Sequence, residues 1–121
     1  MIPIDPSFGT VTSDTRVLLS DPKNQEILAS LIDQPKTAGE LRQVTRLHVV
    51  QVYRRINLLN DAGLIKIHGL CRENSQKPSI IYVSLLKALK IEVTRGRVSY
   101  TLKYVDGRTE EISDSGLVER S

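Results

Sequence analysis

The chain has 121 residues, of which 40% are hydrophobic and 26% are charged, and its formal net charge is +3. This size and composition suit one hydrophobic core with a small extension and exclude a disordered chain. The start of the sequence lacks the features of a signal peptide, and no segment approaches the roughly 18 apolar residues of a membrane span. We therefore expect a cytoplasmic protein. Its single cysteine, Cys71, excludes an intramolecular disulfide and is expected to act as a small hydrophobic residue.

The positive charge is concentrated in the middle of the sequence. Residues 1–35 carry a formal charge of −3, residues 36–90 carry +7 and residues 91–121 carry −1. A basic segment between acidic flanks is typical of a protein that binds a polyanion, although a solvated charged face gives the same pattern. This distribution favours nucleic acid as the partner class.

Two helices are predicted in the first half of the chain. The first begins after Ser20 and Asp21, with Pro22 at its first position, and ends at Pro35. Its apolar stripe consists of Ile27, Leu28, Leu31 and Ile32. The second begins at Thr37 in the segment TAGELRQV, where a reciprocal capping box with Glu40 is expected. Its buried side is expected to consist of Ala38, Leu41 and Val44.

A third helix is predicted from about residue 48 to residue 62, and Gly63 can adopt the positive φ that ends it. At about 100° per residue, one side of this helix is apolar and the other is polar. The inward side consists of Val52, Ile56 and Leu59. The outward side carries Val50, Arg54 and Asn57, with Tyr53 at its flank.

The rest of the sequence predicts strands. The apolar segments LIKIHGL and IIYVSLL, joined by the polar segment CRENSQKPS, indicate a β-hairpin whose tip carries Arg72 and Lys77. Beyond Leu86 the side chains alternate with period two, and Asp106-Gly107 is a favoured hairpin turn. We predict a three-stranded meander at about residues 89–94, 97–105 and 108–112.

Helix, capped short helix, turn, longer helix and hairpin is the order of a winged helix-turn-helix. The segments LSDP, TAGEL, AGLI and KPSIIYVS make residues 17–85 similar to the ArsR-type winged-helix transcriptional regulators, especially the archaeal members. We therefore expect an α+β fold. In it, a winged helix-turn-helix at residues 17–86 follows an N-terminal arm at residues 1–16 and precedes an antiparallel β-meander extension at residues 87–121.

The resemblance implies a homodimeric DNA-binding transcriptional regulator. Its recognition helix, at about residues 48–62, would enter the major groove, and its wing, at about residues 64–85, would follow the DNA backbone. The resemblance implies DNA contacts by the early and outward residues of this helix, which are His48, Val49, Val50, Gln51, Tyr53, Arg54 and Asn57. Further DNA contacts are expected from Arg46, Arg55, Arg72 and Lys77.

The chemistry of these side chains differs. Arg54 can contact guanine or phosphate, and Gln51 and Asn57 can pair with adenine edges, whereas Tyr53 and Arg55 suit phosphate contacts. Val49 and Val50 replace the small polar residues common in the family, which favours readout of DNA shape. His68 is interpreted as a strand residue without a special role.

The meander needs a cover for its apolar face, because isolated hairpins are marginal in water. This face consists of Val98, Tyr100, Leu102 and Tyr104. The cover is either a second subunit or the chain's own helical core, with the meander bracing the wing. We favour dimerisation and interpret the N-terminal arm as crossing onto the other subunit.

No catalytic site, metal site or cofactor is predicted. The sequence has no glycine-rich phosphate loop, nucleophile elbow or metal-ligand spacing. Metal-sensing members of the family that the chain resembles use paired cysteines before the recognition helix or ligands on a C-terminal helix, and neither pattern is present. The sequence does not indicate an effector. The alternative function is a winged-helix protein-protein interaction module in a transcription or replication assembly, favoured by the meander and by Val49 and Val50.

Overall fold

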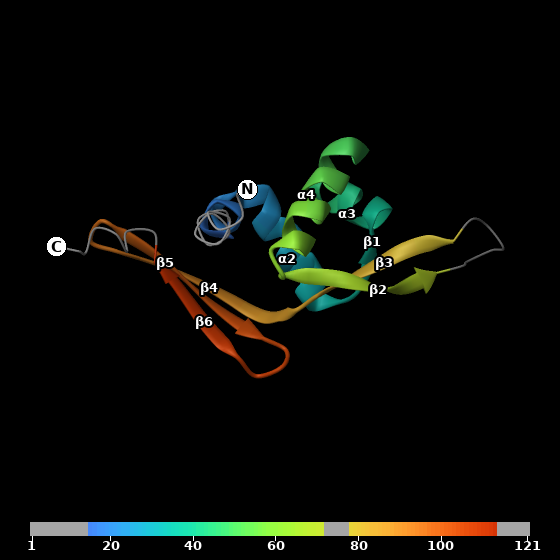
Figure 1. Ribbon diagram of the computed structural model, residues 1–121. Helices are drawn as coiled ribbons and strands as arrows, with labels where there is room; N and C mark the ends of the chain where they lie inside the picture. The colour runs from blue at the N-terminus through green and yellow to red at the C-terminus, as the bar shows by residue number, and fades with distance from the viewer. Residues whose placement is uncertain (1–14, 72–77, 114–121) are drawn as a thin grey trace, which may run out of the picture.

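The computed structural model describes residues 15–71 and 78–113. Residues 15–20 are helical and precede three further helices (Figure 1). These are α2 (Pro22–Asp33), α3 (Ala38–Thr45) and α4 (Val49–Asp61). All three predicted helices are therefore confirmed. Within the described segments, no helix is both long and apolar enough to cross a membrane.

The starts of α2 and α3 follow from local capping. The Asp21 carboxylate accepts a hydrogen bond from the backbone N–H of Lys23 at 2.9 Å, and Pro22 occupies the first turn. At α3, Thr37 Oγ1 accepts from the N–H of Glu40, and Glu40 Oε1 accepts from the N–H of Thr37. The predicted capping box is thus confirmed.

One expectation for α3 is wrong. Val44 is 48% exposed, and Thr45 is buried in its place, at 1% exposure. The buried side of the helix follows the spacing i, i+3, i+7 through Ala38, Leu41 and Thr45, which turns Val44 away from the core. An apolar side chain therefore remains on the outer surface of this helix.

Two three-stranded antiparallel sheets complete the fold. The first has the order β1-β3-β2, with β1 (Lys36–Thr37), β2 (Ile65–Cys71) and β3 (Ser79–Ser84). Strands β2 and β3 are the predicted hairpin, and β1 is an addition that the sequence did not indicate. The second sheet is the predicted meander, with the order β4-β5-β6. Its strands are β4 (Leu86–Thr94), β5 (Arg97–Tyr104) and β6 (Thr109–Ser113).

The chain's own core covers part of the apolar face of the meander. Tyr100, Leu102 and Tyr104 are buried within the single chain, and Val98 packs against the same cluster. Burial raises the pKa of Tyr104 to about 12, and its hydroxyl donates to Glu110 Oε1 at 2.8 Å. The core covers part of this face, while Ile91 and Val93, which pair with Tyr100 and Val98, remain 41% and 72% exposed. The role of the four residues in dimerisation stays a prediction.

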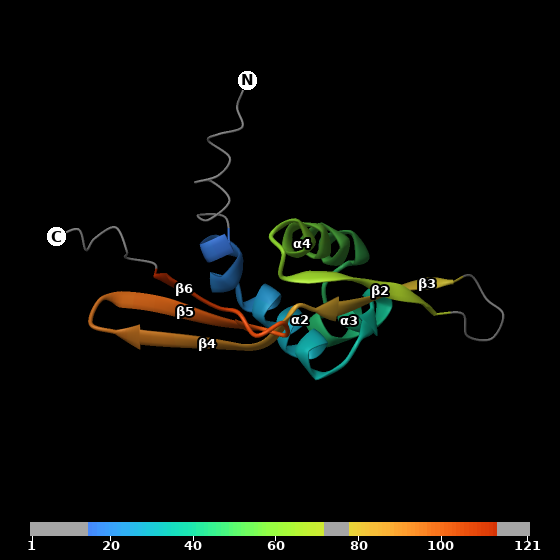
Figure 2. The ribbon, with the colours of Figure 1, turned by 60° about the horizontal axis from the view of Figure 1, so that its bottom comes forward.

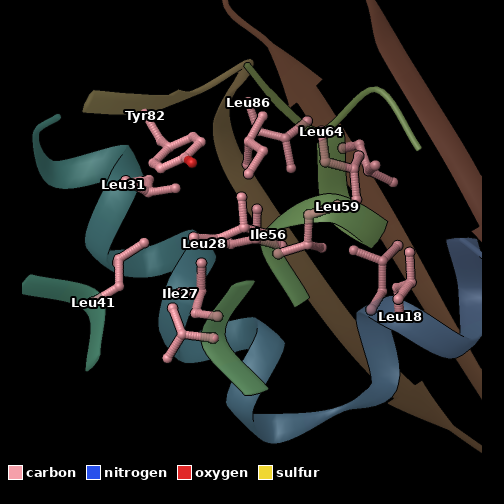
Figure 3. Packing of buried hydrophobic residues seen from close by; sticks show 14 of the residues in the cluster. Leu18, Ile27, Leu28, Leu31, Leu41, Ile56, Leu59, Leu64, Tyr82 and Leu86 are labelled. Carbon is pink, nitrogen blue, oxygen red and sulfur yellow. The ribbon is translucent and has the colours of Figure 1, made fainter. Parts of the chain in front are cut away.

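One core joins the helices to both sheets. Its cluster includes Leu28 of α2, Ile56 of α4, Tyr82 of β3 and Leu86 of β4, which lie around the same interior (Figure 3). The hairpin and the meander extend from opposite sides of the helical body (Figures 1 and 2). The helical residues 15–20 lie over the meander in both views.

A single residue, Leu85, separates β3 from β4. The Ser84 hydroxyl donates to the carbonyl of Leu86 at 2.8 Å and accepts from its N–H at 2.9 Å. The N–H of Leu85 donates to the carbonyl of Leu64, and its carbonyl accepts from the N–H of Val105. This joint fixes the path of the chain from one sheet to the next.

Candidate functional site

The outward surface of α4 carries most of the residues predicted to contact DNA. His48, Val49, Val50, Gln51, Tyr53, Arg54 and Asn57 are all exposed. Among the described residues, the side chains of Gln51, Arg54 and Asn57 have no hydrogen-bond or ion-pair partner. Val52, Ile56 and Leu59 are buried on the opposite side, as predicted. The helix thus combines an apolar anchor with a face of unpaired hydrogen-bonding groups.

Arg55 has a different environment from Arg54. Its Nη1 lies 2.7 Å from Asp21 Oδ2 and 3.0 Å from Asn24 Oδ1. This hydrogen bond from Arg55 is the main cause that lowers the pKa of Asp21, with a further contribution from the N–H of Lys23. The guanidinium of Arg55 thus joins α4 to the start of α2, a role that the sequence did not indicate, and its phosphate contact stays a prediction.

The turn between α3 and α4 is held by Thr45 and Lys23. The hydroxyl of Thr45 donates to the carbonyl of Leu41 at 2.9 Å and accepts from the N–H of Leu47 at 3.3 Å. Lys23 Nζ donates to the carbonyl of Thr45 at 2.8 Å. Arg46 then adopts a left-handed conformation with φ 63° and ψ 27°, and α4 starts at Val49. The turn therefore sets the direction of α4 relative to α3.

Three surface hollows adjoin α4. One of about 260 Å³ lies between α4 and the helical residues 15–20 and is lined by Val17, Gln51, Arg54 and Leu58 among others. A second of about 280 Å³ lies between Tyr53, the start of α3 and the start of β3. The third, of about 370 Å³, lies at the turn before α4. Its lining consists of Arg42, Gln43, Arg46, Leu47 and His48.

Arg42 is a basic residue of this surface that was not predicted from the sequence. It lies four positions before Arg46, and both are exposed. Both residues line the hollow at the turn before α4. The four-residue separation of Arg42 and Arg46 is the feature of the sequence that could have indicated Arg42. The structure therefore adds a second arginine beside Arg46.

The hairpin of β2 and β3 presents an apolar face beyond the core. Ile67, Leu70 and Ile80 are 55%, 62% and 39% exposed, and Ile80 lines the hollow that contains Tyr53. The predicted tip contacts Arg72 and Lys77 lie outside the described residues. His68 is exposed in β2, next to an irregularity in the pairing with β3, and Cys71 is half-buried. In the described segments, no group of three or more His, Cys, Asp or Glu side chains is arranged to hold a metal ion.

Comparison with known proteins fits this arrangement of helices and hairpin. Residues 19–68 match the sequence model of a family described as a helix-turn-helix domain. The structure is similar to that of NolR from Sinorhizobium fredii, with a TM-score of 0.52 and 19% sequence identity, over 69% of this chain and 78% of NolR. The fold is a winged helix-turn-helix. No curated protein sequence matches the chain.

The helices and strands of this chain can be assigned to the parts of a winged helix-turn-helix. The matched segment contains α2, α3, α4 and the start of β2. In this winged helix-turn-helix, α3 and α4 are the two helices of the helix-turn-helix motif. The hairpin of β2 and β3 is the wing, and the strands β4 to β6 form the C-terminal extension. The predicted α+β class and its meander extension are therefore confirmed.

Proposed function

We propose that this protein binds double-stranded DNA and regulates transcription, with α4 in the major groove and the wing along the backbone. The observation that carries the proposal is the outward face of α4, where Gln51, Arg54 and Asn57 are exposed and have no partner within the described segments. These side chains are the donors and acceptors that read base edges. The helix-turn-helix match over residues 19–68 supports the same function.

The roles of the individual residues follow from their chemistry. Arg54 contacts guanine or phosphate, and Gln51 and Asn57 contact adenine edges. Val50, at 68% exposure, contacts a thymine methyl group. Tyr53 of α4 lines the hollow that reaches the start of β3, and this position suits a contact to the DNA backbone. Val49, His48, Arg72 and Lys77 complete the proposed contact set.

We further infer a cytoplasmic homodimer of the ArsR type, similar to the archaeal members, as the segments LSDP, TAGEL and KPSIIYVS favour. Two recognition helices of a dimer would meet successive faces of the major groove about 34 Å apart. The wing and the meander are joined at Leu85, and the buried residues of the meander pack on the core of the same chain. The protein acts by binding and not as an enzyme.

The decisive experiment selects bound duplexes from a random pool and measures their affinity by fluorescence anisotropy. Arg54→Ala is expected to cost about 1–3 kcal/mol of binding and to relax the preference at one base position. Arg95→Ala is the control, because it removes the same charge from the exposed turn between β4 and β5. Arg55 is left intact, since its removal would disturb the contact between α4 and α2. Failure of the wild type to bind any duplex at about 50 mM salt would refute the proposal.

A second candidate function is a protein-protein interaction module of a transcription or replication assembly. Exposed apolar side chains near α4 favour it, because aromatic and aliphatic groups anchor protein interfaces. These are Val49, Val50, Tyr53 and Leu58 of α4, with Ile67 and Leu70 of the wing. Under this alternative, Val50→Ala would weaken capture of a protein partner, while Arg54→Ala would leave the weak affinity for duplex DNA unchanged.

A further inference from the structure

We propose that Arg42 and Arg46 form a phosphate cradle at the turn between α3 and α4, which binds one backbone phosphate of the duplex and fixes the register of α4. This inference rests on the proposed DNA-binding function and adds a named contact to it. The cradle would position the protein without reading sequence, because phosphates are identical along the duplex.

The shape and charge of the third hollow support a phosphate ligand. Its space is about 370 Å³, and its lining contains two guanidinium groups and the imidazole of His48 but no carboxylate. Neither Arg42 nor Arg46 has an ion-pair partner in the described segments. Guanidinium groups bind phosphate through paired, charge-assisted hydrogen bonds. A phosphate in this hollow would therefore meet two guanidinium groups that are unpaired among the described residues.

The backbone of Arg46 supplies an independent observation. Among the described residues, Arg46 is the one non-glycine with positive φ, at 63°. It caps the C-terminus of α3, and its N–H donates to the carbonyl of Arg42 at 2.7 Å. Glycine is preferred at a left-handed helix end, because a side chain there is strained. The strained backbone of Arg46 is therefore consistent with a functional role for this residue, as is common for residues in strained conformations.

The cradle is also held rigidly beside the reading face. The buried hydroxyl of Thr45, at the end of α3, forms hydrogen bonds that hold the turn before α4. Lys23 donates to the carbonyl of Thr45. Helix α4 begins three residues after Arg46, so a phosphate bound here lies next to the first turn that faces the bases. A backbone phosphate flanking the groove fits this place better than an acidic peptide, since the cradle would then act together with the residues of α4.

The test compares Arg42→Ala, Arg46→Gly and the double variant with the wild type on two duplexes of unrelated sequence, from about 50 to 200 mM salt. Each single variant is expected to weaken binding to both duplexes equally. The slope of log K against log salt concentration should become shallower by about one for each phosphate that is no longer neutralised. Arg46→Gly should melt at the same temperature as the wild type or higher, because glycine relieves the strain. Arg95→Ala, which removes one charge from the meander turn, should bind more tightly than either cradle variant.

Several results would overturn the cradle. Wild-type affinity in both single variants, or a weakening confined to one of the two duplexes, would exclude a phosphate contact. A lower melting temperature for Arg46→Gly would show that the arginine stabilises the turn instead. If the variants lost affinity for polyglutamate but kept it for DNA, the cradle would serve an acidic protein partner. A wild type that binds neither duplex would refute the proposed function itself, which separates that failure from failure of the cradle.

Discussion

At the scale of single residues, two adjacent arginines of α4 have separate environments. Helix geometry turns neighbouring side chains apart by about 100°. Arg55 therefore reaches back to Asp21 and Asn24, while Arg54 stays on the exposed side and lines the hollow beside the helical residues 15–20. The first holds α4 against α2, and the second is free to contact a ligand.

The pair of Asp21 and Arg55 predicts a dependence of stability on acid. The pKa of Asp21 is lowered in the folded state. Its stabilising contribution is therefore present above the unfolded pKa of about 3.9 and is lost as the pH falls through the lower folded value. We expect the free energy of unfolding to fall more steeply below about pH 4 in the wild type than in Asp21→Asn, which keeps a capping oxygen but has no charge.

Urea unfolding at a series of pH values measures this difference. Asp33→Asn is a suitable control, because it removes an exposed carboxylate from the same helix. Parallel pH profiles for the wild type and Asp21→Asn would show that the ion pair with Arg55 contributes nothing to stability.

Only part of this residue-level picture could be predicted from the sequence. Asp21 is recognisable as a cap because Pro22 follows it directly. Asp21 also forms an ion pair with Arg55, which lies 34 positions later in the sequence. No local pattern identifies such a pair, so both arginines were expected to contact DNA. The left-handed backbone of Arg46 has no sequence signal either, since glycine would be expected there.

At the scale of elements, the turn between α3 and α4 decides where the recognition helix points. The backbone of this turn is satisfied by one buried hydroxyl and one ammonium group, those of Thr45 and Lys23. A change in these bonds would alter the angle of α4 without touching any of its exposed residues. Stability and binding are therefore coupled at this turn.

Thr45→Val tests this coupling. Valine has nearly the same shape, but it leaves the N–H of Leu47 without its acceptor, which is expected to cost about 1–3 kcal/mol of stability. We also expect weaker binding to duplex DNA, measured by anisotropy beside urea unfolding. Thr45→Ser keeps the hydroxyl and should retain DNA affinity. Equal DNA affinity in both variants would contradict a positioning role for this hydroxyl.

The elements themselves were largely predictable, because their signals are local. The capping box of Thr37 and Glu40, the glycine after α4 and the period-two alternation of the meander each act within a few residues. The error at Val44 arose because Val44 and Thr45 are neighbours and only one of them can face the core. Thr45 is the buried one, and its hydroxyl forms hydrogen bonds with the backbone of the turn.

At the scale of the whole molecule, one core connects the helix-turn-helix, the wing and the meander. Buried residues from α2, α4, β3, β4 and β5 belong to a single cluster. The buried residues of the meander therefore belong to the same core as the helices. We expect the described elements to unfold together.

Leu102→Ala tests whether the meander and the helices unfold together. Leu102 is fully buried on β5, so its truncation should cost about 2–5 kcal/mol and lower the unfolding midpoint of the helices as well as the strands. Val93→Ala is the matched control on the same sheet, since Val93 is 72% exposed and should change stability by at most about 0.5 kcal/mol. Helical circular dichroism during urea unfolding reports the result. Helices that unfold at the wild-type midpoint in Leu102→Ala would show that the meander is independent.

The cover of the meander could not be predicted from the sequence. The alternation of Val98, Tyr100, Leu102 and Tyr104 identifies an apolar face but not what lies against it. A second subunit and the chain's own core leave the same pattern. In the structure the core covers Tyr100, Leu102 and Tyr104, and no local signal in the sequence marks this long-range contact.

The one-residue link between β3 and β4 has a consequence for how this protein can vary in length. The two strands follow one another through Leu85 alone, and the pairing of β4 with β5 shifts between Leu86 and Ala88. An additional residue at position 85 would lengthen the link that the backbone bonds of Leu85 to Leu64 and Val105 hold. We therefore expect this link to tolerate an insertion less well than the exposed turn at Asp106 and Gly107.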